Sequence, residues 1–371
     1  MKLTKVLVLF GGPSSEHEVS LMSAASVLKN MDKEIFEIIP VGITPEGVFQ
    51  LYERQFDIQK EKWEGFEEAR FEYEEYRKNI QLIPGESVLI ACDNHSWEKI
   101  QVDMALPILH GPYGEDGTLQ GLLQACNIPY AGAGVMTSAL AMDKAFTKKL
   151  LENEKIDQAP YRVVDLIRSG TINDSLINEL ERDLNFPMFV KPARMGSSVG
   201  ISKASHPKEL EEALKKALVH DSKVVVEAFV EGREIECAVL GHYQDPIVAA
   251  PAEIIPSREF YDYEDKYLAG KSHYKIPAEL SEQDTEKAKE LSIRVYQLLE
   301  CKGLARVDFF LDRKTGQLLV NEINTMPGFT KISMYPKMWE ASGLSYKKLI
   351  TCLIEEAIED KLAYCSVDGE G

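Results

Sequence analysis

The chain has 371 residues, 44% hydrophobic and 27% charged, which is typical of a soluble globular protein with two or three domains. Its 42 basic and 60 acidic residues give a net charge of −18, which disfavours nucleic acids and anionic membrane surfaces as partners. No apolar run has the length of a transmembrane helix, and the N-terminus predicts a strand, not a signal peptide. Six scattered cysteines without a CxxC pair favour a reduced, cytoplasmic protein without disulfides or a zinc site.

The first third of the chain alternates short apolar runs with a helical pattern. This order predicts a parallel sheet with right-handed crossovers. We expect a strand over 6–10, a helix over 15–28, and further strands over 35–42 and 102–109. Residues 53–78 interleave charged and aromatic side chains and predict an amphipathic insertion over the sheet edge, with a solvated face and an aromatic underside.

The rest of the chain mixes strands and helices. The run AGAG at 131–134 predicts a linker. Beyond it, the pattern predicts helices over 143–152 and 207–218, a helix from the N-cap Ser281 to Gly303, and strands over 186–191 and 224–230. The fold class expected from this order is α/β or α+β, without internal repeats.

A hairpin near the C-terminus carries the strongest chemical signal. Residues 305–311 and 318–324 alternate with period 2 around a turn, and a register that pairs Asp308 with Glu322 brings both carboxylates close to Asn324. Facing carboxylates destabilise a sheet unless a cation lies between them, and these oxygens suit Mg²⁺ bound to nucleotide phosphates. The alternative is a polar strand face that meets only solvent.

A second signal is the Gly/Ser-rich segment KPARMGSSVG at 191–200, between two expected strands. Such a loop can present backbone N–H groups to phosphate oxygens, although a plain turn is the commoner outcome. Its GSSVG run also fits the serine-hydrolase pattern GxSxG with Ser198 as nucleophile. That motif requires a strand followed directly by a helix, whereas here another extended run follows.

Several charged residues are candidates for ligand contacts. Lys144 and Lys191 can reach a phosphate as point charges, and Glu227 ends a strand where a carboxylate can accept hydrogen bonds from adenine or ribose. Glu16 follows the first glycine loop at a helix N-terminus, where it can cap the helix or hold a substrate ammonium group. Surface lysines, a charged strand end and a cap are the ordinary alternatives.

Eight segments, taken together and in order, resemble the ATP-grasp ligases, and among them the D-alanine–D-alanine ligases. They span residues 11–336, nearly the whole chain. The segments are GGPSSEHEVS (11–20), HGPYGEDGTLQG (110–121), MDK (142–144), KPARMGSSVG (191–200), EAFVEGREIE (227–236), FYDYEDKY (260–267), ARVDFF (305–310) and NEINTMPGFTKISMYP (321–336).

The resemblance implies an ATP-grasp fold. It implies a Rossmann-like parallel-sheet domain at 1–133 and two α+β domains at 134–228 and 229–371 that sandwich ATP. It also implies a cytoplasmic homodimer, formed through the N-terminal domain, that joins two D-alanines for peptidoglycan through a D-alanyl phosphate. ATP, two Mg²⁺ or Mn²⁺ ions and room for a monovalent cation belong to this expectation.

The resemblance also assigns roles to individual residues. Glu16 would bind the ammonium of the first D-alanine, with His110 nearby, and Ser197 and Tyr267 would join Glu16 to close a loop at 257–276 over the site. Arg306 and the Gly328 N–H would stabilise the oxyanion, and Ser333 with Met334 would receive the second substrate. The ATP contacts would be Lys144, Lys191, Ser197, Ser198, Glu227, Phe229, Val230, Glu234, Lys266, Asn321 and Glu322, and the metal ligands Asp308, Glu322 and Asn324.

Alternatives remain at this point. The intact Tyr267 favours D-alanine over D-lactate as the second substrate, but a ligase of the D-lactate or D-serine type would share the ATP and metal residues. Two hypotheses from other functional classes also remain: a serine hydrolase that uses Ser198, and a nucleotide-binding protein without catalytic activity. The 53–78 insertion matches no family segment.

Overall fold

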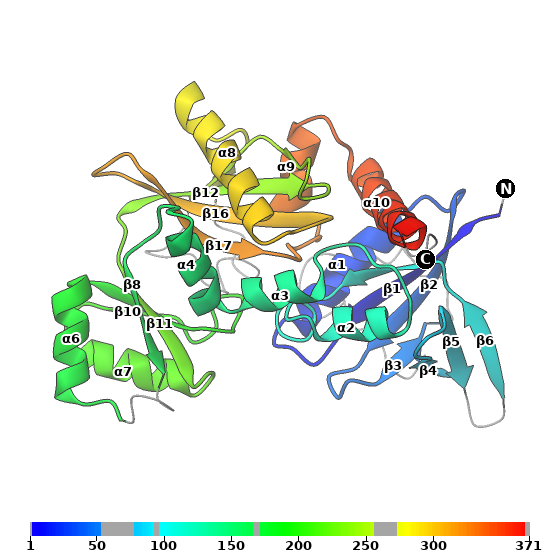
Figure 1. Cartoon of the computed structure of the whole chain (residues 1–371), viewed down its shortest axis with the longest axis horizontal. Coiled ribbons are helices and arrows are strands. Elements are labelled where there is room, and N and C mark those ends of the chain that lie inside the picture. Colours follow the sequence, from blue (N-terminus) through cyan, green and yellow to red (C-terminus); the bar gives the residue numbers. More distant parts are fainter. Residues whose placement is uncertain (1, 53–77, 93–95, 166–170, 256–272, 368–371) are drawn as a thin grey trace.

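The computed structural model describes residues 2–52, 78–92, 96–165, 171–255 and 273–367, with side chains described as far as residue 360. The chain forms three sheets. In Figure 1 the first (blue to cyan) and second (green) lie at opposite ends of the molecule, with the third (yellow-green to orange) between them at the top of the view. Lys266, Tyr267 and all but the last residue of the 53–78 insertion lie outside the described residues.

The first sheet has seven strands in the order β6-β5-β4-β3-β2-β1-β7. Only the three strands at one edge are parallel, so the expectation of a parallel sheet is correct for these and wrong for the rest, which extend it as an antiparallel meander. The parallel strands are β1 (Thr4–Gly11), β2 (Phe36–Ile43) and β7 (Met104–Ile108), and the others are β3 (Phe49–Leu51), β4 (Lys78–Leu82), β5 (Val88–Cys92) and β6 (Trp97–Gln101).

The second sheet is four-stranded and antiparallel, in the order β10-β9-β11-β8. Its strands are β8 (Tyr161–Asp165), β9 (Met188–Pro192), β10 (Ser202–Ala204) and β11 (Lys223–Ala228). The apolar stripes of α6 (Asp174–Leu184) and α7 (Pro207–Leu218) cover one face, where Leu180, Leu210 and Leu214 pack against Val190 and Val224. The opposite face is left for the polar pair Lys191 and Glu227, because alternate residues of a strand face opposite ways.

The third sheet is antiparallel, in the order β15-β14-β12-β16-β17, with β13 added to β12. It contains the predicted hairpin with the predicted register, since Asp308 pairs with Glu322 and Arg306 with Asn324. A bulge follows Asp308, so the register shifts beyond it. The strands are β12 (Gly232–Leu240), β13 (Ile247–Val248), β14 (Ala252–Ile255), β15 (His273–Lys275), β16 (Leu304–Asp312) and β17 (Leu318–Asn324).

Helix α8 (Glu282–Leu298) covers the third sheet, and Ser281 caps it by accepting a hydrogen bond from the Asp284 N–H at 3.0 Å. The predicted cap is therefore confirmed, but the predicted end at Gly303 is wrong. The helix ends at Leu298 because Glu300 adopts a positive φ of 48°, which a right-handed helix cannot contain.

The remaining helices join the sheets to one another. They are α1 (His17–Asn30), α2 (Thr118–Ala125), α3 (Val135–Met142), α4 (Lys144–Asn153), α9 (Met334–Ala341) and α10 (Tyr346–Val367). Leu349 and Leu353 of α10 pack against Val8 and Leu106 of the first sheet, and Leu151 of α4 joins the core of the third. The boundaries at 133 and 228 stay a prediction, because these cores draw on residues from both sides of them. Among the described residues, no helix combines the length and apolar character needed to cross a membrane.

Candidate active site

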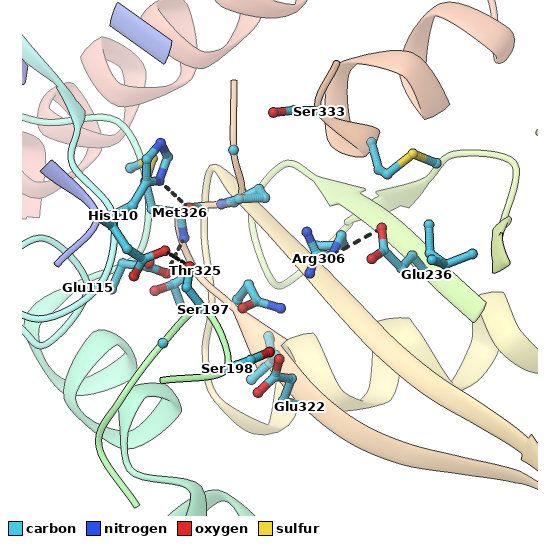
Figure 2. A pocket seen from close by; sticks show the side chains of 18 of the residues that line it. His110, Glu115, Ser197, Ser198, Glu236, Arg306, Glu322, Thr325, Met326 and Ser333 are labelled. Atoms are coloured by element: carbon cyan, nitrogen blue, oxygen red, sulfur yellow. Dashed lines mark hydrogen bonds and ion pairs between the residues drawn. The ribbon is translucent and has the colours of Figure 1, made fainter. Parts of the chain in front are cut away.

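The three sheets meet around a cavity of about 320 Å³ (Figure 2). The loops after β1, β7 and β9, the paired strands β16 and β17, and the loop between β17 and α9 form its walls. The cavity brings together predicted residues that are scattered along the sequence: Glu16, His110, Lys144, Ser197, Ser198, Arg306, Glu322, Asn324, Gly328, Ser333 and Met334.

Glu16 and Ser197 meet across the cavity wall although 181 residues separate them. The Ser197 hydroxyl donates a hydrogen bond to the Glu16 carboxylate at the start of α1, where Glu16 is 5% exposed. Two glycines allow this approach, since a Cβ at Gly111 or Gly196 would lie 2.3 or 2.6 Å from Glu16 Oε2. Ser197 and Ser198 both have positive φ, 45° and 60°, so a strained loop holds the Ser197 hydroxyl at this position.

The loop at 193–201 joins β9 to the antiparallel strand β10, and α7 begins only at Pro207. The strand-to-helix elbow of a serine hydrolase is therefore absent from this described segment, which leaves the Ser198 nucleophile reading without support. Lys144 instead ties the loop to the hairpin: its Nζ donates to the Met195 carbonyl at 2.8 Å and lies 3.4 Å from Glu322 Oε2.

A buried cluster of charges lies behind this loop, outside the lining of the cavity. Glu227 is 3% exposed, and its two oxygens lie 3.0 Å from Lys148 Nζ and 2.7 Å from Lys191 Nζ. Burial alone would raise the pKa of Glu227, but the two lysine charges hold it at about 2. Lys191 also donates to Asn321 Oδ1 at 3.1 Å and so links the second sheet to the third.

Three more of the predicted ATP contacts lie next to these charges. Phe229 is 36% exposed, packs at 6.0 Å between ring centroids against Phe189, and has Lys203 Nζ 4.6 Å from its ring centroid. Val230 and Glu234 are half-buried where β11 passes into β12. An exposed aromatic face beside a buried carboxylate and cations is suited to a nucleotide base and its phosphates.

On the hairpin, Arg306 neutralises the facing carboxylates. Its Nε and Nη2 each donate to one Asp308 oxygen at 2.7 Å, and its Nε lies 3.4 Å from Glu236 Oε2 (Figure 2). Burial would lower the pKa of Arg306, but the charges of Asp308 and Glu236 raise it. The guanidinium therefore stays charged at the cavity wall.

Asp308, Glu322 and Asn324 have the oxygen donors that Mg²⁺ prefers. Asn324 Nδ2 donates to Asp308 Oδ2 at 3.0 Å, so the amide and one carboxylate are already adjacent. The described residues contain no metal-binding cluster of three or more His, Cys, Asp or Glu side chains. The donor set fits a metal provided that the ion replaces Arg306 and Lys144 as counter-charge to the two carboxylates.

At the far side of the cavity, the β17–α9 loop (residues 325–333) leads to Ser333 and Met334. Ser333 Oγ accepts a hydrogen bond from the Thr330 N–H at 3.0 Å, and Gly328 is packed so close that a Cβ there would lie 2.7 Å from Ser333 Oγ. Met334 begins α9, whose first backbone N–H groups point back from the helix start.

Known proteins similar to this chain belong to a family that agrees with this arrangement of residues. Family models described as D-ala D-ala ligase N-terminus and C-terminus match residues 5–133 and 150–355. The chain belongs to the D-alanine–D-alanine ligase family. Curated D-alanine–D-alanine ligases of Caldicellulosiruptor bescii and Halothermothrix orenii are each 47% identical over 97% of this chain and over 96% and 100% of their own lengths.

Solved structures agree with this family assignment. The D-alanine–D-alanine ligase from Coxiella burnetii has a TM-score of 0.84 at 33% identity and covers 99% of this chain and 97% of its own. The VanG D-Ala:D-Ser ligase from Enterococcus faecalis has a TM-score of 0.82 at 35% identity, with coverage of 96% and 100%. These ligases have the ATP-grasp fold, which confirms the expected fold class.

The family resemblance did not name every residue that the cavity uses. Glu115, Glu236 and Lys337 line it, and Lys148 is buried against Glu227. Burial and the charge of Glu16 raise the pKa of Glu115 to about 8. The position of Glu115 between glycines in the predicted loop was a local sign that it could be functional. Lys148 offered no such sign, because a lysine on a helix is normally exposed to solvent.

Proposed function

We propose that this protein joins two D-alanines to D-alanyl-D-alanine at the expense of ATP, as an ATP-dependent carboxylate–amine ligase. The observation that carries the proposal is the shared cavity: the Glu16–Ser197 pair faces the same space as Arg306 and Asn324, both of which are hydrogen-bonded to Asp308. The former suits an ammonium group and the latter a phosphorylated carboxylate. A D-amino acid next to ATP phosphates requires both kinds of group in one place.

The first step transfers the γ-phosphoryl group of ATP to the carboxylate of the first D-alanine, with ADP as the leaving group and D-alanyl phosphate as the product. Glu16 holds the ammonium of that D-alanine, and Lys144 and Lys191 hold phosphate oxygens as point charges. Asp308, Glu322 and Asn324 would hold Mg²⁺ or Mn²⁺, which would neutralise charge on the phosphates when bound. A protein nucleophile is not needed, because positioning and electrostatics do most of the work in phosphoryl transfer.

The second step is attack by the amine of the second D-alanine on the acyl phosphate, which expels phosphate. Arg306 and the Gly328 N–H stabilise the developing oxyanion, while Ser333 and the start of α9 receive the carboxylate of the second substrate. Water has to be excluded from the site in this step, because water would hydrolyse the acyl phosphate.

The identity of the second substrate separates this proposal from its nearest alternative. The similarity to the VanG D-Ala:D-Ser ligase favours D-serine as the acceptor to compare with D-alanine, and D-lactate is the other. These acceptors share the carboxylate and differ in side chain or nucleophile. A comparison of these acceptors therefore tests the second-substrate site at the far side of the cavity and does not depend on the residues that bind ATP.

The deciding experiment is phosphate release from Mg-ATP with D-alanine alone, and then with D-alanine plus D-serine or D-lactate. We expect release to depend on D-alanine and the product to be the D-alanyl-D-alanine dipeptide. Release that is independent of D-alanine contradicts the ligase proposal. A product that contains mainly D-serine or D-lactate would replace the acceptor assignment and leave the ligase class intact.

The metal set has its own test in Glu322→Gln, which removes one carboxylate charge. We expect turnover to fall at least about 100-fold while the thermal midpoint changes little, since electrostatic stabilisation of this kind is worth about 3–4 kcal/mol. Glu231→Gln, at an exposed glutamate before β12, is the matched control and should keep full activity. Normal turnover of Glu322→Gln would contradict the role of Glu322 as a metal ligand.

We also infer a cytoplasmic homodimer that associates through the N-terminal domain, residues 1–133. Light scattering of the purified protein should give a mass near twice 41.7 kDa. A monomeric mass at micromolar concentration would contradict this part of the proposal.

A further inference from the structure

The β17–α9 loop connects the metal-ligand candidate Asn324 to the second-substrate residue Ser333. Thr325, Met326, Phe329 and Thr330 are all at most 5% exposed, which is unusual for a connecting segment. Its buried backbone groups therefore need hydrogen-bond partners. Several of them are side chains from the first 115 residues of the chain.

Met326 is held by both of its backbone groups. Its N–H donates to Glu115 Oε2 at 2.9 Å, and its carbonyl lies 3.0 Å from His110 Nδ1. Figure 2 shows both interactions converging on Met326 from the same side of the cavity. The second Glu115 oxygen accepts from the Gly111 N–H at 2.8 Å, so Glu115 ties the loop after β7 to the β17–α9 loop.

The tautomer of His110 follows from its partners. A carbonyl can only accept, so Nδ1 must carry the proton that is donated to Met326. Burial lowers the pKa of His110, so the ring is neutral and Nε2 must accept, from the Ser23 hydroxyl at 2.9 Å. Ser23 Oγ in turn accepts from the Phe329 N–H at 3.3 Å. Both ring nitrogens are thus engaged, and neither is free to bind a substrate.

We propose that His110 and Glu115 are positioning residues, which act on the reaction by fixing the β17–α9 loop and not by touching the first substrate. This rests on the proposed function above and replaces the family-based expectation that His110 lies against the first D-alanine. Met326 is two residues after Asn324 and two before Gly328. Holding its peptide groups from both sides fixes where the Asn324 amide and the Gly328 N–H point.

The physical consequence is specific. A displacement of about 1 Å of catalytic groups can cost about 100-fold in rate. Loss of the His110 or Glu115 hydrogen bonds releases the loop that carries the oxyanion donor, whereas Glu16 and Ser197, which hold the first substrate, keep their own contact. The turnover number should therefore fall while the KM for the first D-alanine stays the same.

The test compares kcat and the two separate KM values for D-alanine in His110→Ala, His110→Asn and Glu115→Gln. We expect His110→Ala to lower kcat about 10- to 100-fold with less than a threefold change in the first KM. His110→Asn should recover most of the loss, because its amide can donate from about the position of Nδ1. Glu115→Gln should lower kcat as well, since a donor group replaces one of the two acceptors.

Asp116→Asn is the matched control on the same loop. Asp116 accepts hydrogen bonds from Tyr113 and Thr118, within the loop, and does not line the cavity, so kcat should stay within about twofold. Thermal melts of all variants identify any that fail to fold, and His110→Asn keeps the test available if His110→Ala does.

Two results would overturn the proposal. A first KM raised tenfold or more in His110→Ala, with kcat preserved, would show direct contact between His110 and the first substrate. Unchanged kcat in both His110→Ala and Glu115→Gln would show that the clamp on Met326 has no part in the reaction. Failure of the wild-type protein to release phosphate with D-alanine would count against the proposed function itself and is distinguishable from both.

Discussion

Glu227 is a carboxylate that the protein has removed from water and compensated with two lysines. Each of its oxygens faces a different ammonium group, from Lys148 on α4 and Lys191 on β9. An isolated buried charge costs several kcal/mol, so removal of either lysine leaves one oxygen of the buried carboxylate without its cationic partner. The three residues therefore have to be treated as one electrostatic unit.

Replacement of Lys148 by methionine tests that unit. Breaking a buried ion pair from one side costs about 3–5 kcal/mol, and we expect Lys148→Met to lower the free energy of unfolding by about that amount in urea titrations. The neighbouring Lys149 is exposed, so Lys149→Met should change it by less than about 0.5 kcal/mol. Equal effects of the two substitutions would contradict the special burial of Lys148.

Glu115 predicts a pH dependence of stability. Its pKa is about 8 in the folded protein because of burial and the nearby Glu16, against 4.5 in the unfolded chain. Between these values the folded state binds the extra proton, so the free energy of unfolding should fall as the pH rises from about 5 to about 8. Glu115→Gln cannot titrate and should show a flatter slope in urea titrations at these two pH values. Parallel slopes would contradict the raised pKa.

At the scale of the element, the two loops that carry Gly111 and Gly196 close over Glu16. Gly196→Ala places a Cβ 2.6 Å from Glu16 Oε2, so the carboxylate has to move out of its contact with Ser197. We expect about a 100-fold loss of D-alanine-dependent phosphate release with a folded protein.

Gly121→Ala is the control for that substitution. Gly121 lies within α2 and a Cβ there meets nothing within 4 Å, so activity should be kept and stability should rise by about 0.5–1 kcal/mol. Retention of full activity by Gly196→Ala would remove the requirement for the Glu16–Ser197 contact.

How far elements can be predicted from sequence depends on the range of the forces that fix them. The register of Asp308 against Glu322 was predictable, because strand alternation and a short turn are local properties. The end of α8 was not predictable, because it depends on the positive φ of Glu300. The antiparallel half of the first sheet was not predictable either, because it depends on which strands pair with one another in the folded chain.

Contacts that a side chain makes with a residue far away in the sequence could not be predicted. The hydrogen bond from His110 to the Met326 carbonyl joins residues that are 216 positions apart, and no pattern in the sequence around either residue predicts it. Lys148 was missed for the same reason: only the folded position of Glu227 distinguishes it from the exposed lysine beside it.

For the whole molecule, the packing of α10 matters most. Leu349, Ile350, Leu353 and Ile354 belong to the same apolar core as Val6, Val8 and Phe10 of β1. One face of the first sheet is therefore covered by α1 together with a helix that lies more than 300 residues after β1. The core on the opposite face is formed within residues 1–133.

A fragment of residues 1–133 keeps the core on one face of the sheet but lacks α10 on the other, and we expect this loss to prevent cooperative folding. We expect weak near-ultraviolet circular dichroism, binding of a hydrophobic dye and no sharp urea transition, because the face that α10 covers is left in water. The full chain measured under the same conditions is the control. A cooperative transition of the fragment would show that the boundary at 133 delimits an independent domain.

The covering of β1 by α10 also has a consequence for synthesis. About 216 residues separate position 133 from Leu349, and at about 5–20 residues per second the ribosome needs roughly 10 to 40 s to add them. During that time α1 covers part of this sheet face, and the apolar surface that α10 later covers stays exposed. Helix α10 is thus the element that ends the exposure of this sheet face to chaperones, and a chain that stalls before α10 keeps a binding site for them.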